Sequence, residues 1–80
     1  MITVELRYYA QLREQAGTGG ERVSTDAETP AALYDTLRLR HGFSLPRDAL
    51  KIAVNTAFCS WETRLRDGDV VVFVPPVNGG

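Results

Sequence analysis

The chain ends in the stretch Val70-Val71-Val72-Phe73-Val74-Pro75-Pro76-Val77-Asn78-Gly79-Gly80, and this stretch decides the fold. Residues 70–74 form an unbroken apolar run of β-branched and aromatic side chains. The run follows the turn residues Asp67, Gly68 and Asp69. Such a run is typical of a strand that is buried on both faces. We therefore predict a buried strand over residues 70–74.

The two prolines that follow must end this strand. Pro75 and Pro76 have no backbone N–H to donate to a neighbouring strand, and each holds φ near that of an extended polyproline helix. We therefore expect residues 1–75 to form a single domain and residues 76–80 to project from it as a flexible tail. The two glycines at its end carry no side chain, so they gain nothing from burial and can enter a narrow cleft.

The terminal glycine is the candidate reactive group. At ordinary glycine usage, two final glycines arise by chance in roughly 0.5% of chains, so a frayed end is the less favoured interpretation. Five residues past a proline reach at most about 17 Å when extended, which is enough to thread into another protein. We expect the α-carboxylate of Gly80 to react inside a partner's active site, reached by insertion of Pro75, Pro76, Val77, Asn78 and Gly79.

Length and composition point to a small carrier without a catalytic pocket of its own. Eighty residues allow one small domain, and a net charge of -1 gives no field for holding nucleic acid or an anionic membrane. The single cysteine, Cys59, cannot form an internal disulfide, and no signal peptide pattern follows Met1, so we expect a cytoplasmic protein. His41 is the only histidine and has no partners for a metal site, so we expect it to cap a helix or lie at the surface.

Two helices are predicted from capping residues. A short helix over residues 9–16 ends at Gly17, which stands where a left-handed cap would. A longer helix has Thr29 as N-cap and Pro30 in its first position, and it runs to His41 before Gly42. Its apolar positions form one stripe, so this helix packs on one face of a sheet.

Four further strands are predicted from hydrophobic alternation and turns. They cover residues 2–8, 21–24, 50–54 and 57–61, with turns at residues 18–20 and at Asn55-Thr56. One main helix on one face of a small mixed sheet is an α+β architecture. The final strand is best placed in the sheet centre, beside the first strand and under the helix. This arrangement is the β-grasp, or ubiquitin-like, fold.

These residues carry a resemblance to a known family. Phe73-Val74-Pro75-Pro76-Val77-Asn78-Gly79-Gly80 resembles the F-x-P-P-V-x-G-G ending of the MoaD family, the small sulfur-carrying subunits of molybdopterin synthase, within the wider MoaD/ThiS group. Further matching motifs are Tyr8-Tyr9-Ala10-Gln11-Leu12-Arg13-Glu14, Val54-Asn55 and Leu65-x-Asp67-Gly68-Asp69-x-Val71. Where the family often has two aromatics before the prolines, this chain has Phe73 and Val74.

The resemblance implies a non-catalytic sulfur donor. An E1-like (MoeB-like) adenylyltransferase would use ATP to activate Gly80, and a sulfur donor protein would convert the adenylate into a thiocarboxylate. The tail would then deliver sulfur inside the large, MoaE-like catalytic subunit, in a heterotetramer, to build molybdopterin from cyclic pyranopterin monophosphate. No cofactor or metal bound by the chain itself is expected.

Two related functions remain open at this level. A sulfur carrier of the thiamine pathway also ends in Gly-Gly on a β-grasp, and a ubiquitin-like modifier uses the same activated glycine with a lysine amine as acceptor. A stand-alone enzyme is disfavoured, because the carboxylates show no paired acid and base spacing.

A hydrophobic docking surface is predicted near the tail. One helix cannot cover all apolar surface of an 80-residue sheet, so part of it should be exposed for the large subunit. Strand alternation puts Tyr9 opposite Tyr8, so at most one of this pair should be core. The candidate interface residues are Tyr8, Tyr9, Phe58 and Phe73.

Overall fold

The computed structural model describes residues 1–76. Along the chain, its elements are β1 (Ile2–Arg7), α1 (Ala10–Ala16), β2 (Gly20–Thr25), α2 (Pro30–His41), the 3₁₀ helix η1 (Arg47–Ala49), β3 (Lys51–Val54), β4 (Ala57–Cys59) and β5 (Val70–Val74). Within these residues the strands form one five-stranded mixed sheet in the order β2-β1-β5-β3-β4.

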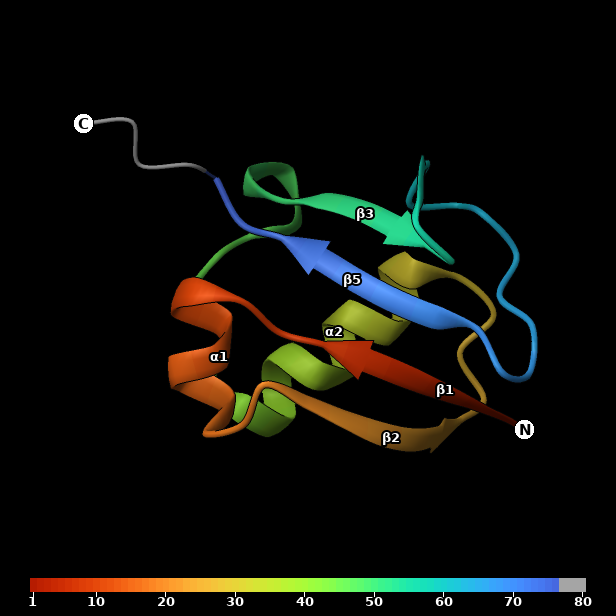
Figure 1. Cartoon of the computed structure of the whole chain (residues 1–80), viewed down its shortest axis with the longest axis horizontal. Coiled ribbons are helices and arrows are strands. Elements are labelled where there is room, and N and C mark those ends of the chain that lie inside the picture. Colours follow the sequence, from red (N-terminus) through yellow and green to blue (C-terminus); the bar gives the residue numbers. More distant parts are fainter. Residues whose placement is uncertain (77–80) are drawn as a thin grey trace.

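Strand β5 lies in the centre of the sheet, parallel to β1 and antiparallel to β3 (Figure 1). The β1–β2 and β3–β4 pairs are antiparallel and form the two flanks. Because β1 and β5 run in the same direction, the N-terminus lies at the end of the sheet opposite to the one where β5 stops. The predicted α+β, ubiquitin-like β-grasp fold with a central last strand is confirmed.

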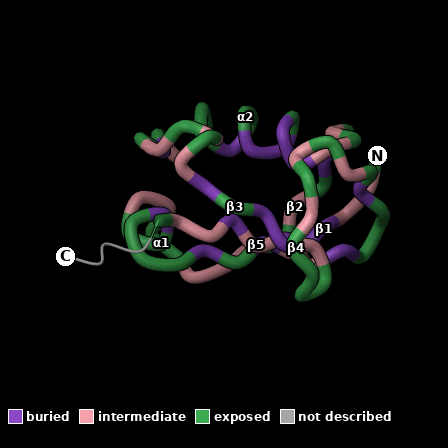
Figure 2. Tube along the Cα trace, turned by 90° about the horizontal axis from the view of Figure 1, so that it is seen from above, coloured by how far each residue is buried: buried purple, intermediate pink, exposed green. Residues whose placement is uncertain are grey.

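Helix α2 covers one face of the sheet (Figure 2). Val71 and Phe73 of β5 point to this side and are fully buried, whereas the valines at 70, 72 and 74 are half-buried. No helix within residues 1–76 covers the opposite face, so the prediction that β5 is buried on both faces is wrong. The core cluster consists of Val4, Leu6, Tyr8, Leu12, Leu33, Tyr34, Leu37, Phe43, Leu50, Ile52, Leu65, Val71 and Phe73.

Both predicted helices have the predicted caps. The Thr29 hydroxyl accepts a hydrogen bond from the Ala32 amide at 3.2 Å, which satisfies one free N–H of the first turn of α2. Gly42 and Gly17 end α2 and α1 with φ of 71° and 77°, in the left-handed region that glycine enters without strain.

The first helix and the four strands predicted from alternation have boundaries that differ from the predicted ones, by two residues at the end of β4 and by one residue elsewhere. Gly20, expected in a turn, is the first residue of β2, where a Cβ would lie 2.8 Å from the carbonyl oxygen of Leu6. Because β1 and β2 approach each other so closely here, only a residue without a side chain fits at this position of the strand. Strand β4 ends at Cys59 instead of residue 61. Trp61 turns back to the core, where its ring stacks on Phe73 at a centroid distance of 5.9 Å.

Candidate functional site

The candidate site begins where β5 leaves the sheet. Val74, the last strand residue, is paired with Lys51 at the start of β3. Pro75 is half-buried and Pro76 is exposed, so the chain reaches the surface within two residues of the last strand pair. The other residues predicted to insert, Val77, Asn78 and Gly79, and the predicted reactive Gly80, lie outside the described residues. The structure therefore defines the surface from which this segment departs.

The uncovered side of the sheet carries a row of apolar side chains. Ala53 of β3 is paired on one side with Phe58 of β4 and on the other with Val72 of β5. Because paired residues of neighbouring strands lie on the same face, these three side chains form a continuous row. Phe58 is 70% exposed. We call the uncovered side, with Phe58, Ala53, Val72 and Val74 as its apolar members, the open face.

Tyr9 adds a second exposed aromatic ring close to the tail end of the sheet. It is 52% exposed and is the N-cap residue of α1, two residues after the end of β1. Its backbone is extended, with φ -131° and ψ 154°, so its side chain points to the side opposite that of Tyr8. The prediction that at most one of these two tyrosines is core is confirmed. Tyr9 and Phe58 are therefore the interface candidates that a partner can reach.

Tyr8 and Phe73 belong to the core, so their predicted exposure is wrong. Phe73 is fully buried, and its ring centroid lies 5.1 Å from that of Tyr34 on α2. Tyr8 is 1% exposed and meets Phe43 edge-on at 5.5 Å. Side chains alternate between the two faces of a strand, so Tyr8 lies on the same face as the buried Leu6, and Phe73 lies on the same face as the buried Val71. This alternation explains why both rings are in the core.

A polar cluster connects β1, β2 and α2 at the edge of the core. The Tyr8 hydroxyl donates to Oε2 of Glu21 at 2.6 Å, and Nε2 of His41 lies 2.6 Å from the same oxygen. His41 is the last residue of α2, as predicted, but its side chain is only 15% exposed and contacts Glu21, so the predicted surface position is wrong. The partners lie 13 and 20 residues apart in the sequence, and for this reason no local pattern reveals the cluster.

The pKa values of this cluster follow from its geometry. Burial, the hydrogen bond to Glu21 and the negative charge of that carboxylate raise the pKa of Tyr8. Burial opposes ionisation of Glu21, but hydrogen bonds from Tyr8 and His41 and the nearby charge of Arg40 outweigh it and lower the pKa of Glu21. The hydroxyl therefore stays protonated and the carboxylate ionised at neutral pH, which suits a structural connection between three elements.

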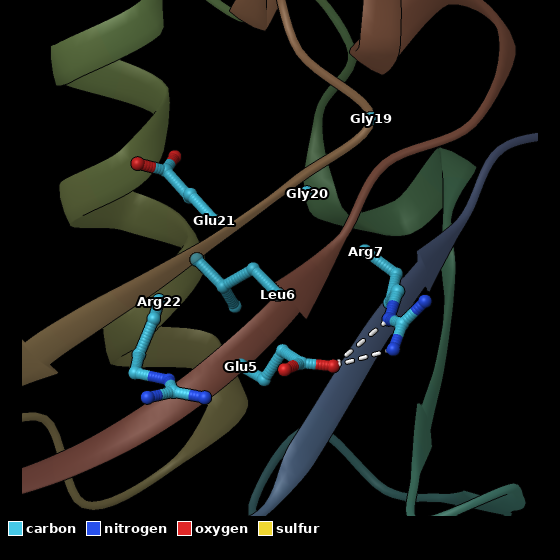
Figure 3. A pocket seen from close by; sticks show the side chains of 7 residues that line it. All are labelled: Glu5, Leu6, Arg7, Gly19, Gly20, Glu21 and Arg22. Atoms are coloured by element: carbon cyan, nitrogen blue, oxygen red, sulfur yellow. Dashed lines mark hydrogen bonds and ion pairs between the residues drawn. The ribbon is translucent and has the colours of Figure 1, made fainter.

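A shallow hollow of about 490 Å³ lies over β1 and β2 (Figure 3). Nη2 of Arg7 lies 2.5 Å from Oε2 of Glu5, so these two charges neutralise each other. Arg22 reaches along the same side, whereas the Glu21 carboxylate points away toward α2. The hollow is therefore a charged surface, and its side chains do not converge on one point as catalytic groups would.

The described residues contain neither a metal-binding cluster nor a membrane-spanning helix. Among residues 1–76, no group of three or more His, Cys, Asp and Glu side chains is placed to hold a metal ion. No helix in this part of the chain is both long and apolar enough to cross a membrane.

Comparison with known proteins places this geometry in a family. A model of the ThiS family matches residues 6–80. The chain belongs to the ThiS family. The molybdopterin synthase sulfur carrier subunit of Escherichia coli (strain K12) is 36% identical over 80 residues, which cover 96% of this chain and 99% of the relative. The resemblance found in the motifs is therefore confirmed over nearly the whole chain, and its relatives are small sulfur carrier subunits.

Two solved structures of this family's fold are similar to the chain. Small archaeal modifier protein 1 from Methanosarcina acetivorans is 25% identical, with a TM-score of 0.80 and coverage of 100% of this chain and 98% of that one. The complex of subunits 1 and 2 of molybdopterin-converting factor from Helicobacter pylori contains a chain that is 26% identical. It has a TM-score of 0.69 and coverage of 99% of this chain and 100% of that one. The same fold thus occurs both in a modifier protein and in a complex of two subunits of a molybdopterin-converting factor.

Proposed function

We propose that this chain is the sulfur carrier subunit of a molybdopterin synthase and that Gly80 carries the sulfur. The observation that carries the proposal is the match to the Escherichia coli sulfur carrier subunit over nearly the full length of both chains. The position of β5 supports it, since a strand held between β1 and β3 gives Pro75 and the residues after it a fixed starting point.

The chemistry begins with activation of a carboxylate. A terminal carboxyl has a pKa of about 3.5, so it is ionised in the cell and is a poor electrophile. A partner adenylyltransferase joins it to the α-phosphate of ATP and releases pyrophosphate, while the chain itself binds no cofactor. The sulfur of a persulfide donor then attacks the acyl carbon, and AMP leaves. Reductive cleavage of the sulfur–sulfur bond by a thiol leaves a thiocarboxylate on Gly80.

Delivery takes place inside the large catalytic subunit. The thiocarboxylate sulfur is a nucleophile, and two successive deliveries to cyclic pyranopterin monophosphate supply both sulfurs of the molybdopterin dithiolene. A closed pocket makes transfer effectively unimolecular and keeps water from the activated acyl group. The two-subunit complex from Helicobacter pylori supports this partnership, and we propose a heterotetramer with two copies of each subunit.

The open face is the proposed docking surface for the large subunit. Exposed Phe58 and Tyr9 offer large aromatic contacts, and aromatic anchors dominate binding energy at protein interfaces. Val72 and Val74 continue this apolar surface to the point where Pro75 leaves the sheet. A partner that covers the open face can therefore also receive the tail.

Conjugation to proteins is the second candidate function. The similarity to small archaeal modifier protein 1 favours it, and it differs only in the acceptor, a lysine amine that attacks the activated glycine in place of a persulfide. A thiamine-pathway carrier would use the same thiocarboxylate with a different final acceptor.

A reconstituted assay tests the proposal. The chain is incubated with the adenylyltransferase, ATP, a persulfide donor and a thiol reductant, and then with the large subunit and cyclic pyranopterin monophosphate. We expect an intact-mass increase of about 16 Da, from replacement of one oxygen by sulfur, which disappears as molybdopterin forms. A variant without Gly80 should keep the fold but acquire no sulfur. A truncated variant that still supports synthesis, or a full-length chain that forms only isopeptide bonds, would contradict the proposal.

A further inference from the structure

Within β5, most of the information on register comes from one side chain. Register in a sheet is usually fixed because a one-residue slip moves apolar side chains from the core to solvent. Here residues 70–74 are four valines and one phenylalanine, so a one-residue slip still places a valine at two of the four valine positions. Only Phe73, with its ring against Tyr34 and Trp61, distinguishes one register from the next. A second set of contacts holds the other end of the strand, where β5 starts.

Asn55, in the turn between β3 and β4, holds the first residue of β5. Its side-chain Oδ1 accepts from the Val70 amide at 2.9 Å, and its own amide donates to the Val70 carbonyl at 2.8 Å. Its Nδ2 donates to Oδ1 of Asp69 at 2.9 Å. Asn55 has a positive φ of 51°, a conformation that asparagine adopts more readily than most residues.

Asp69 also forms hydrogen bonds with the turn before β5, at Arg66, and with β1, at Glu5. It is only 8% exposed, its Oδ2 accepts from the Arg66 amide at 2.8 Å, and its carbonyl accepts from the Glu5 amide of β1 at 2.9 Å. A buried carboxylate with hydrogen bonds on both oxygens is costly to move, because any shift leaves charged lone pairs without donors. Asn55 and Asp69 thus connect β1, the β3–β4 turn and β5 at one point.

We propose that Asn55 and Asp69 are positioning residues that fix the register of β5 and thereby the reach of Gly80 into a partner's active site. This inference rests on the proposed function. Each residue of register moves a strand by about 3.3 Å, so a slip of one would shift the start of the tail by that distance. A misplacement of about 1 Å at a reacting centre can cost roughly 10²-fold in rate. Fixing register is also the best-attested role of buried polar groups in proteins.

A reciprocal exchange of the two side chains tests the pair. Asn55→Asp alone places two carboxylates side by side, and Asp69→Asn alone places two amide groups there. In the double variant, the carboxylate at position 55 accepts from Val70 and from the new amide at position 69, whose oxygen accepts from Arg66. Every hydrogen bond of the original pair then has a counterpart.

Two measurements compare the variants with the wild-type chain, one of strand register and one of the rate of sulfur transfer. The first is the NMR cross-strand contact between Ala53 and Val72, which reports register without any partner. The second is single-turnover sulfur transfer from preformed thiocarboxylate at saturating large subunit. We expect the single variants to show additional cross-strand contacts and about tenfold or slower transfer. The double variant should restore one register and a rate within about threefold of wild type.

Thr29→Ala is the matched control, because it removes the N-cap of α2 without touching β5. It should destabilise the domain but leave the saturated transfer rate unchanged.

Three results would overturn the proposal. The single variants could keep one register and transfer sulfur at the wild-type rate, or the double variant could fail to restore the register and the rate. Thr29→Ala could also slow transfer as much as the single variants do. If Asn55→Asp does not fold, Asn55→Ala gives the same comparison with Asp69 left in place. A wild-type chain that transfers no sulfur would contradict the proposed function instead, while the NMR register would still test the pair.

Discussion

The two faces of the sheet differ in what their side chains contact, although β5 contributes to both. On the covered face, Val71 and Phe73 are fully buried under α2. On the open face, Val72 and Val74 of the same strand are half-buried, and Phe58, on the far side of Ala53 from Val72, is largely exposed. Alternate residues of one strand are thus divided between stabilising the fold and offering apolar surface, which a composition count over the run cannot reveal.

The covered face is held by a connected set of aromatic rings. Neighbouring centroids lie 5.1 to 5.9 Å apart, within the range in which ring pairs attract each other. The set consists of Tyr8, Phe43, Tyr34, Phe73 and Trp61. No such layer lies on the open face within residues 1–76. Substitutions on the covered face should therefore lower stability, whereas substitutions on the open face should weaken partner binding.

The largest expected effect is on the covered face. Phe73→Ala removes a fully buried ring between Tyr34 and Trp61 and should lower the free energy of unfolding by about 3–5 kcal/mol. Urea unfolding followed by circular dichroism measures this loss. Phe58→Ala is the matched control and should change the free energy by less than about 0.5 kcal/mol. If both variants lost the same free energy of unfolding, the two faces would not differ in their contribution to stability.

The next effect belongs to the open face. Phe58→Asp places a charge where a partner is proposed to dock, and it should weaken binding of the large subunit by about tenfold or more while the unfolding free energy stays nearly constant. Titration calorimetry measures the affinity. Leu39→Asp, at an 89% exposed position on α2, controls for the loss of any exposed apolar side chain. If both variants bind as wild type does, the open face is not the docking surface.

A smaller effect is expected at the exit from β5. Replacing Pro75 and Pro76 with alanine keeps the sheet but increases the entropy lost when the tail is threaded, by about 0.4–1 kcal/mol per proline. Binding to the large subunit should weaken by roughly 4–30-fold for the pair, with the saturated transfer rate unchanged. Normal affinity combined with a thousandfold slower transfer would show that the prolines position the reacting atom.

The smallest effect concerns the polar edge of the covered face. Because the folded state lowers the pKa of Glu21, its carboxylate stabilises the fold at pH values above its unfolded pKa of about 4.3. This contribution is lost as the pH falls through the lower, folded value. The stability difference between wild type and Glu21→Gln should therefore be constant near neutral pH and shrink in acid. Glu62→Gln, at an exposed position, is the control, and a difference that grows in acid would contradict the assignment.

Local sequence signals predict both α-helices, the five strands and their order along the chain, but not the short 3₁₀ helix η1. Thr29, Gly17 and Gly42 mark helix ends because capping depends on one residue and its immediate neighbours. The central place of β5 followed from having only one main helix to cover a strongly apolar run. The same reasoning overestimated the burial of β5, because an apolar run does not show that a second layer is absent.

Contacts between distant segments were not predictable in this way. The exposure of Tyr8 and Phe73 was mispredicted because their rings are buried by α2 and by residues 43 and 61, far away in the sequence. The hydrogen bonds of Glu21 with Tyr8 and His41 depend on three elements meeting, as does the Asn55–Asp69 pair. A sequence motif can contain such residues, as it does for Asn55 and Asp69, but only the folded structure shows which segments they connect.

The central claim is that this chain carries sulfur on its terminal glycine, and the intact mass of the protein purified from its own cells tests it most directly. The account predicts a fraction of the protein heavier by about 16 Da than the sequence requires, with the addition mapped to Gly80 by fragmentation. A chain found only at its sequence mass, or joined to other proteins through an isopeptide bond at Gly80, would contradict it.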